Sequence, residues 1–490
     1  MILASQVTNL ESPISSQTDW IYSIELNRRF LKMIGAWPLS LSFSKLDKIG
    51  SVILTIASGF LIGFLLIHCA LCAFLDNQVD LDAKAKLMGP LSFFIMTASK
   101  YYIIIRRGKA LGKCVEHMRH DWQKATDKRN SRDREIMIDC AKFGRFLAIF
   151  CAVFMYSGGF FYTTLMPLCV KRTEIIDNET VRSQVFPIYR GLLDPRTSPS
   201  FELMQLLQCL AGFVLYSVTV SACSLAAVFV MHACGQFKIL IWKLDDYVGK
   251  FKRSATKHSS LLEIYGRIFL PQQSCLFSFV SQVESLLHEV CFVELVGTTL
   301  NICFLGYYML TVFFQKQHTP LIVALTYLIF LVSLTFNIFI LCYIGEILSE
   351  ECKKVGLMAY MVEWYRLPGK QPLDLILVVA TSNTPIRLTA GKLIELSLPT
   401  FCSVSIAFLN IFGNKTNGCS LSFVRYLPSK FTKSLRKTEH QLTLVLTYCN
   451  MLSDKQKFFS NWFTLFRLLD HRWLTSASFE LLRNKMKYTC

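Results

Sequence analysis

The sequence contains several long apolar runs in which charged residues are absent or rare. A helix rises 1.5 Å per residue, so about 20 apolar residues cross the ~30 Å hydrocarbon core of a bilayer. Residues 49–75 and 203–237 contain no charged side chain and exceed this length. The whole chain is 52% hydrophobic and only 18% charged, which is too apolar for a set of water-soluble domains. The sequence therefore predicts an integral membrane protein.

Seven apolar regions are candidate spans, and the last of them is in two pieces. They are residues 49–75, 87–105, 146–170, 203–237, 286–315, 321–345, and the split region 373–380 and 388–412. The predicted fold class is an all-α integral membrane protein with seven transmembrane helices, the seventh split. The fourth region is too long for one perpendicular span, so we expect its helix to tilt or to project into the aqueous phase.

A few charged residues interrupt these regions. We expect Lys100 to snorkel toward a membrane interface, which keeps its ammonium in water. Glu289 and Glu294 are expected at the membrane edge rather than along an ion path. Lys392 and Glu395 are three residues apart, so they are expected to pair on one helix face, or else to face an inner vestibule.

The distribution of Lys and Arg between the loops predicts the orientation of the chain. The N-terminal segment and every second loop together hold 26 of these residues, against 8 in the other loops. Positive charge concentrates on the cytoplasmic side, so the N-terminus is predicted to be cytoplasmic and the seventh span to end outside. The glycosylation acceptor Asn178, in Asn-Glu-Thr, falls in a predicted outer loop and agrees with this orientation. Residues 1–48 are then a cytoplasmic segment and residues 49–412 the seven-helix domain.

Other functional classes fit the sequence less well. A G-protein-signalling receptor with seven helices would have the opposite orientation, and the seventh region has no Asn-Pro-x-x-Tyr motif. A secondary transporter with a broken helix stays an alternative, although it predicts a matching broken span in an inverted half. No motif of an enzyme, cofactor site or metal site is present, so none of these is expected. The net charge of +18 is explained by membrane orientation rather than by a nucleic-acid partner.

Several strings resemble a known family. They are His232-Ala-Cys-Gly-Gln-Phe237, Leu341-Cys-Tyr-Ile-Gly-Glu-Ile-Leu348, Glu363-Trp-Tyr-Arg-Leu-Pro368, Pro385-Ile-Arg-Leu-Thr-Ala-Gly-Lys392 and Leu396-Ser-Leu-Pro-Thr-Phe401. In this order and at these spacings, over residues 15–404, the chain resembles the insect odorant receptors. The resemblance implies a ligand-gated non-selective cation channel that binds small volatile organic molecules. It also implies a heterotetramer with the co-receptor Orco in the plasma membrane of olfactory sensory neurons.

The resemblance places three sets of residues. The odorant pocket would lie among the outer halves of spans two to six, where aromatic side chains suit apolar ligands, although ordinary helix packing would explain each of them equally well. The expected pocket residues are Phe93, Phe94, Tyr156, Gly158, Phe161, Phe213, Tyr216, Tyr327 and Phe330. The expected anchor between subunits comprises Gly345, Glu346, Tyr360, Trp364, Tyr365 and Pro368. The expected pore helix presents Leu396, Phe401, Val404, Ala407 and Phe412.

Residues 413–490 form a basic tail that departs from the family pattern. The tail holds 13 Lys and Arg against 4 Asp and Glu, on the side predicted to be poor in positive charge. Its apolar stretches are too short to span a bilayer. Either the tail is an extracellular appendage with Asn414 glycosylated, or the gene model reads past a splice junction. We favour the second explanation, under which this exact chain is not expected to conduct.

Overall fold

The computed structural model describes most of the chain as far as residue 413. The described residues are 2–41, 44–75, 81–125, 131–169, 200–253, 258–314, 321–361 and 387–413, with short pieces of 173–189 and 376–382. The chain divides into two compact units, Met1–Phe408 and Leu409–Cys490. Of the second unit only the end of one helix is described.

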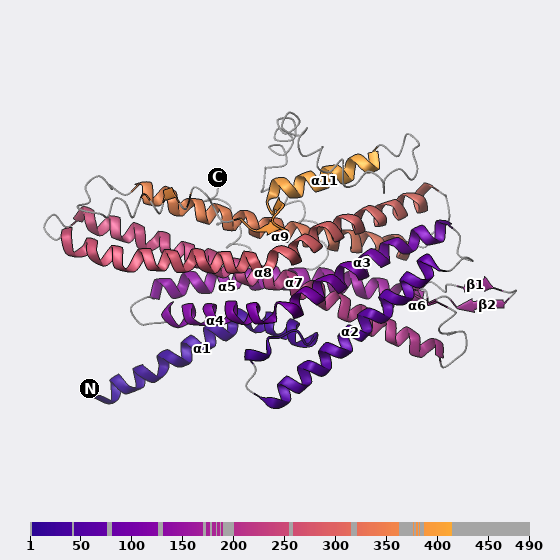
Figure 1. Cartoon of the computed structure of the whole chain (residues 1–490), viewed down its shortest axis with the longest axis horizontal. Coiled ribbons are helices and arrows are strands. Elements are labelled where there is room, and N and C mark those ends of the chain that lie inside the picture. Colours follow the sequence, from indigo (N-terminus) through magenta and orange to yellow (C-terminus); the bar gives the residue numbers. More distant parts are fainter. Residues whose placement is uncertain are drawn as a thin grey trace. The chain divides into compact units, whose positions relative to one another are not determined.

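Long helices make up nearly all of the described chain (Figure 1). The long helices are α1 (Ile2–Met33), α2 (Lys45–Phe74), α3 (Leu81–Arg106), α4 (Gly108–Ala125), α5 (Ser131–Phe160), α7 (Ser200–Arg253), α8 (His258–Phe314), α9 (Leu321–Met361) and α11 (Leu398–Gly413). The short helical turns are η1 (Leu39–Leu41), the π-helical η2 (Phe161–Leu165) and α6 (Met166–Cys169). The described residues also form two antiparallel hairpins, β1 (Thr173–Ile176) with β2 (Glu179–Arg182) and β3 (Thr389–Ala390) with β4 (Ile394–Glu395).

Five helices in the described part of the chain are long and apolar enough to cross a membrane. They are Lys45–Phe74, Leu87–Arg106, Ser200–Asp246, Gln272–Gly306 and Leu325–Met361, which match the predicted first, second, fourth, fifth and sixth spans. The predicted third span is not one regular helix, because it starts inside α5 and continues through the π turn η2 into α6. The second half of the seventh span is α11, which has 16 residues.

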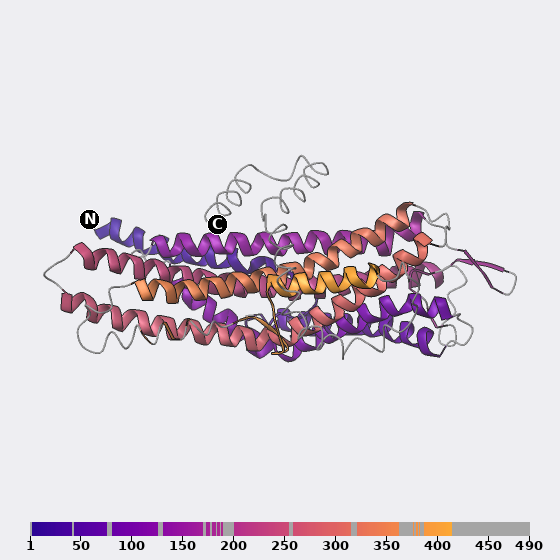
Figure 2. The same cartoon turned by 90° about the horizontal axis from the view of Figure 1, so that it is seen from above.

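Helix α7 is the centre of the bundle. In the apolar 18-residue segment of α7, 94% of the residues are buried, whereas only 28% are buried in the corresponding segment of α2. A helix that is apolar on all sides belongs in a protein interior, and α7 packs against α5, α8 and α9. Its 54 residues span about 81 Å, which confirms a helix longer than a bilayer. Figures 1 and 2 show the hairpin β1–β2 at one end of the bundle, and the last turns of α7 and the first turns of α8 at the other.

The expectation for Lys100 and Glu294 is wrong. Neither lies at an interface, because the two side chains are 0% and 3% exposed and their charged atoms are 2.6 Å apart. A carboxylate from another helix stabilises the ammonium inside the bundle, so Lys100 has no need to reach water. Glu289 of α8 lies beside the end of α3, where Arg106 and Arg107 both bind its carboxylate.

The expected helix over residues 388–412 is also wrong in its first third. The chain instead forms the hairpin β3–β4, and helix α11 begins only at Leu398. Gly391 and Lys392 adopt positive φ angles of 63° and 60°, which an α-helix does not allow. Glu395 binds Arg387, so the expected helical pair of Lys392 with Glu395 does not form.

A cluster of ionisable groups joins α4 to α7 and predicts a pH effect on stability. Asp121 lies 3.6 Å from His117 and 3.2 Å from His232. Burial lowers the pKa of His117 from its ordinary value of 6.5. Asp121 opposes this shift, whereas the positive charges of His232, Lys124 and His120 add to it.

As the pH falls below about 6.5, the unfolded chain therefore binds a proton that folded His117 resists, and stability decreases. We expect the Tm of the purified protein to be lower at pH 5.5 than at pH 7.5, with a smaller difference in His117→Gln. An equal difference in both proteins would contradict the assignment to His117.

Candidate functional site

Aromatic side chains from three helices and one turn meet near the β1–β2 end of the bundle. The ring of Phe93 in α3 lies 6.0 Å from Tyr216 in α7 and 5.7 Å from Phe330 in α9, centre to centre. The ring of Tyr162 in η2 lies 6.0 Å from that of Phe330 and 6.1 Å from that of Tyr327, centre to centre. These separations are those of favourable aromatic pairs. The structure thus brings together four of the expected pocket residues, Phe93, Tyr216, Tyr327 and Phe330, around Tyr162.

A loop residue closes this group on one side. Phe186 lies 5.7 Å from Tyr162 and 5.1 Å from Phe94, between ring centres. Both backbone groups of Phe186 bind Gln208, with the N–H donating at 3.2 Å and the C=O accepting at 2.8 Å. We call Phe93, Phe94, Tyr162, Phe186, Tyr216, Tyr327 and Phe330 the aromatic cluster.

Sequence reasoning missed Tyr162 and Phe186. Tyr162 follows Gly158 by four residues, and both residues lie against Phe330. This four-residue spacing is the sequence pattern that could have indicated Tyr162 as a pocket residue. Phe186 stands in a loop, where no helical periodicity indicates a direction.

Three expected pocket residues lie elsewhere. Tyr156 and Phe213 stack on each other at 5.5 Å, and the hydroxyl of Tyr156 bonds Ser217 at 2.9 Å. Phe213 is 47% exposed, so its ring lies at the surface of the chain. Phe161 contacts Phe160, which is itself 55% exposed.

Two adjacent glycines let α5 approach its neighbours. A Cβ atom on Gly158 would lie 2.9 Å from the hydroxyl of Ser333 in α9. A Cβ atom on Gly159 would lie 2.3 Å from the ring of Tyr216. Gly158 is therefore a packing contact beside Phe330, and Gly159 is what allows Tyr216 its position in the cluster.

The middle of α9 contacts the start of α11. A Cβ on Gly345 would lie 2.3 Å from the carbonyl oxygen of Leu396. The carboxylate of Glu346 accepts a hydrogen bond from the backbone N–H of Leu398 at 3.2 Å, at the first residue of the helix. Two turns before Glu346 on α9, the ring of Phe339 lies 5.3 Å from that of Phe401 in α11, centre to centre. Gly345 and Glu346, expected at a subunit anchor, thus hold the expected pore helix within this chain.

The remaining expected residues have mixed positions. Leu396 and Val404 are 3% and 7% exposed, and Tyr360 is 63% exposed near the end of α9. Ala407 and Phe412 lie in α11, but their side chains are outside the description. Trp364, Tyr365, Pro368, Asn178 and the tail after residue 413 lie outside the described residues. Within the described ranges, no three His, Cys, Asp or Glu side chains are arranged to hold a metal ion.

Comparison with known sequences identifies one family. Residues 85–407 match the profile of the family 7tm Odorant receptor. Odorant receptor 10 of Aedes albopictus is 22% identical over 239 residues, covering 46% of this chain and 61% of that protein. Odorant receptor 2a of Drosophila melanogaster is 24% identical over 130 residues, covering 26% of this chain and 32% of that protein. The chain thus spans less than two thirds of the length of these relatives.

Solved structures share the fold. The olfactory receptor OR5 of Machilis hrabei in complex with eugenol matches with a TM-score of 0.62 and 16% identity, over 80% of this chain and 98% of that one. The structure of the same receptor described without that ligand matches with a TM-score of 0.58. At this identity the likeness shows the all-helical seven-transmembrane fold.

Proposed function

This chain belongs to the 7tm odorant receptor family, and we propose that it is the odorant-binding subunit of a ligand-gated, non-selective cation channel. It is a multi-pass membrane protein of the receptor class. The proposed ligands are small volatile organic molecules. Burial of apolar surface and aromatic contact would supply most of their binding free energy.

The observation that carries this proposal is the course of helix α9. Near its start it presents Tyr327 and Phe330 to the aromatic cluster, and past its middle Gly345 and Glu346 contact Leu396 and Leu398 at the start of α11. A ligand that parts the rings would move α9, and α9 contacts α11 directly. The arrangement suits a receptor whose pocket is coupled to a pore helix, with the pore itself formed by several subunits.

The proposed partners and location follow the family. We propose a heterotetramer with the co-receptor Orco in the plasma membrane of olfactory sensory neurons, with the N-terminus cytoplasmic. The concentration of Lys and Arg in the N-terminal segment and alternate loops supports this orientation.

Whole-cell recording tests the proposal. The chain is expressed with Orco in two forms, complete and ending at residue 412, and a panel of volatile molecules is applied. We expect a cation current that persists in excised patches without nucleotides, which a G-protein pathway would not give. Current only from the shortened form would support a non-native tail. Silence of both forms at normal surface levels would contradict the channel function.

Tyr162 is expected to determine potency. The ring contacts Phe186, Tyr327 and Phe330, so Tyr162→Ala removes aromatic surface from the centre of the cluster. A loss of about 1.4 kcal/mol of ligand contact corresponds to a tenfold higher EC50. The matched control is Phe213→Ala, because Phe213 is also a span aromatic but lies at the surface. Equal shifts in the two variants would contradict the placement of the pocket.

A further inference from the structure

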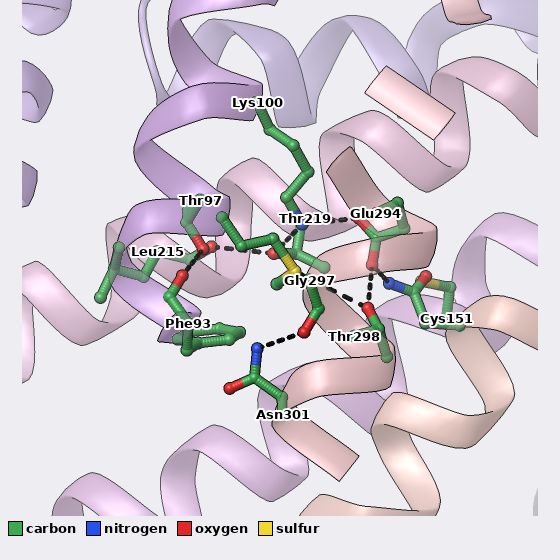
Figure 3. Close-up of polar contacts among 12 residues, drawn as sticks. Phe93, Thr97, Lys100, Cys151, Leu215, Thr219, Glu294, Gly297, Thr298 and Asn301 are labelled. Carbon is green, nitrogen blue, oxygen red and sulfur yellow. Dashed lines mark hydrogen bonds and ion pairs between the residues drawn. The ribbon is translucent and has the colours of Figure 1, made fainter. Parts of the chain in front are cut away.

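A chain of polar side chains crosses the interior of the bundle (Figure 3). The ammonium of Lys100 in α3 donates to Glu294 in α8 at 2.6 Å and to the hydroxyl of Thr219 in α7 at 3.0 Å. The other carboxylate oxygen of Glu294 accepts from Thr298 at 3.0 Å and from the amide of Asn337 in α9. We call these five residues the Lys100–Glu294 network.

Stability does not by itself explain a network of this kind. All five side chains belong to buried residues, of which Lys100, Thr219 and Thr298 are 0% exposed. Removing two charges from water is costly, and well-packed apolar pairs are often at least as stable as a buried ion pair. Ionisable residues inside a membrane usually serve a function for this reason. Its hydrogen bonds fix the positions of four helices, α3, α7, α8 and α9, relative to one another.

The network lies directly beyond the aromatic cluster on the same helix faces. Lys100 follows Phe93 by seven residues in α3, and Asn337 follows Phe330 by seven in α9. Seven residues are about two helical turns, or roughly 10 Å. In α7, Thr219 follows Tyr216 by three residues, which also places them on one face. Three helices that build the cluster are therefore tied together two turns or less below it.

The network also lies before the contact with α11. Gly345, which packs on Leu396, follows Asn337 by eight residues in α9, about 12 Å along the helix. Helix α5 also contacts the network, because the thiol of Cys151 lies 3.6 Å from the amide oxygen of Asn337. Motion of α9 between the cluster and α11 must change these hydrogen bonds.

We infer that the Lys100–Glu294 network is a positioning device that holds α3, α7, α8 and α9 in the resting arrangement between pocket and pore helix. This inference rests on the proposed function. Ligand entry must weaken the network before α9 can shift against its neighbours. The residues position the helices and need not touch the ligand.

The central experiment replaces the ion pair by an apolar pair. Lys100→Met with Glu294→Met removes both charges together, so no buried charge is left unpaired. In cells that also express Orco, we expect surface levels within twofold of the original chain. The current without odour should rise at least fivefold, and the EC50 should fall. Normal surface levels with unchanged basal current and EC50 would overturn the inference.

A milder pair of variants guards against failure to fold. Thr298→Val removes one hydrogen bond to Glu294 with almost no change in shape. Its matched control is Thr299→Val, because Thr299 donates to the backbone of Leu295 and is outside the network. We expect the basal current to rise about twofold in Thr298→Val only. Equal behaviour of the two variants would also overturn the inference.

A chemical readout separates this inference from the channel proposal. Cys151 is 2% exposed, and N-ethylmaleimide labelling of Cys151 in membranes, measured by mass spectrometry, reports how tightly α5 and α9 pack. Labelling should become at least threefold faster in the double methionine variant, whether or not the chain conducts. Faster labelling without any current would retain the positioning role and reject the channel. Unchanged labelling would reject the positioning role.

Discussion

Replacing Gly345 with valine is expected to reduce the maximal odour-evoked current to less than about a tenth of its original value. A Cβ at this position would lie 2.3 Å from the carbonyl oxygen and 3.2 Å from the Cβ of Leu396. Leu396 is 3% exposed, and its N–H donates to the carbonyl of Leu388 at 2.9 Å, so it cannot move without opening the β3–β4 hairpin. Overpacking against backbone atoms forces such shifts. The start of α11 would then be displaced from α9.

Gly63→Val is the matched control for this prediction. Gly63 lies inside α2, and no described atom is within 4 Å of the position of its Cβ. The same chemical change there costs only the difference in helix propensity, a few tenths of a kcal/mol in either direction. Biotin labelling of surface protein normalises the currents of both variants. A normal maximal current in Gly345→Val would show that α9 and α11 do not pack in this way.

The spans could be predicted because each depends on its own local sequence. An uncharged run such as residues 49–75 satisfies the length of a bilayer without reference to any other part of the chain. The positions of the aromatic residues Phe93, Tyr216 and Phe330 could also be predicted, because each residue lies on an apolar helix at a depth that the span boundaries define. Their selection as a pocket came from the family resemblance, not from periodicity.

The features that sequence reasoning missed depend on distant partners or on local departures from helical geometry. Lys100 and Glu294 are 194 residues apart, so their pairing could not be read from either span alone. Tyr162 lies in the π turn η2, which departs from regular α-helical geometry. The apolar run from Leu388 was predicted to be helical, yet the chain turns into a hairpin at Gly391. The backbone N–H of Gly391 donates a hydrogen bond to the carbonyl oxygen of His288 in α8 at 2.8 Å. Contacts with α8 outweigh helix propensity there.

Replacing Gly159 with valine is expected to raise the EC50 for odour at least about tenfold, which corresponds to 1.4 kcal/mol of binding free energy. The new Cβ would lie 2.3 Å and 2.4 Å from two ring atoms of Tyr216. Tyr216 is 5% exposed and its ring contacts that of Phe93, so a displaced Tyr216 ring would disturb the aromatic cluster. Gly59→Val is the control, since no described atom lies within 4 Å of that Cβ position.

The two glycine variants should fail in different ways, and this difference tests the coupling along α9. Gly159→Val alters the pocket but leaves the contact between Gly345 and Leu396 intact, so saturating odour should still give most of the current. Gly345→Val alters the link to α11, so no odour concentration should restore the current. Full dose–response curves, normalised to surface protein, separate the two effects. If Gly159→Val lowered the maximal current without changing the EC50, the aromatic cluster would not be the odorant pocket.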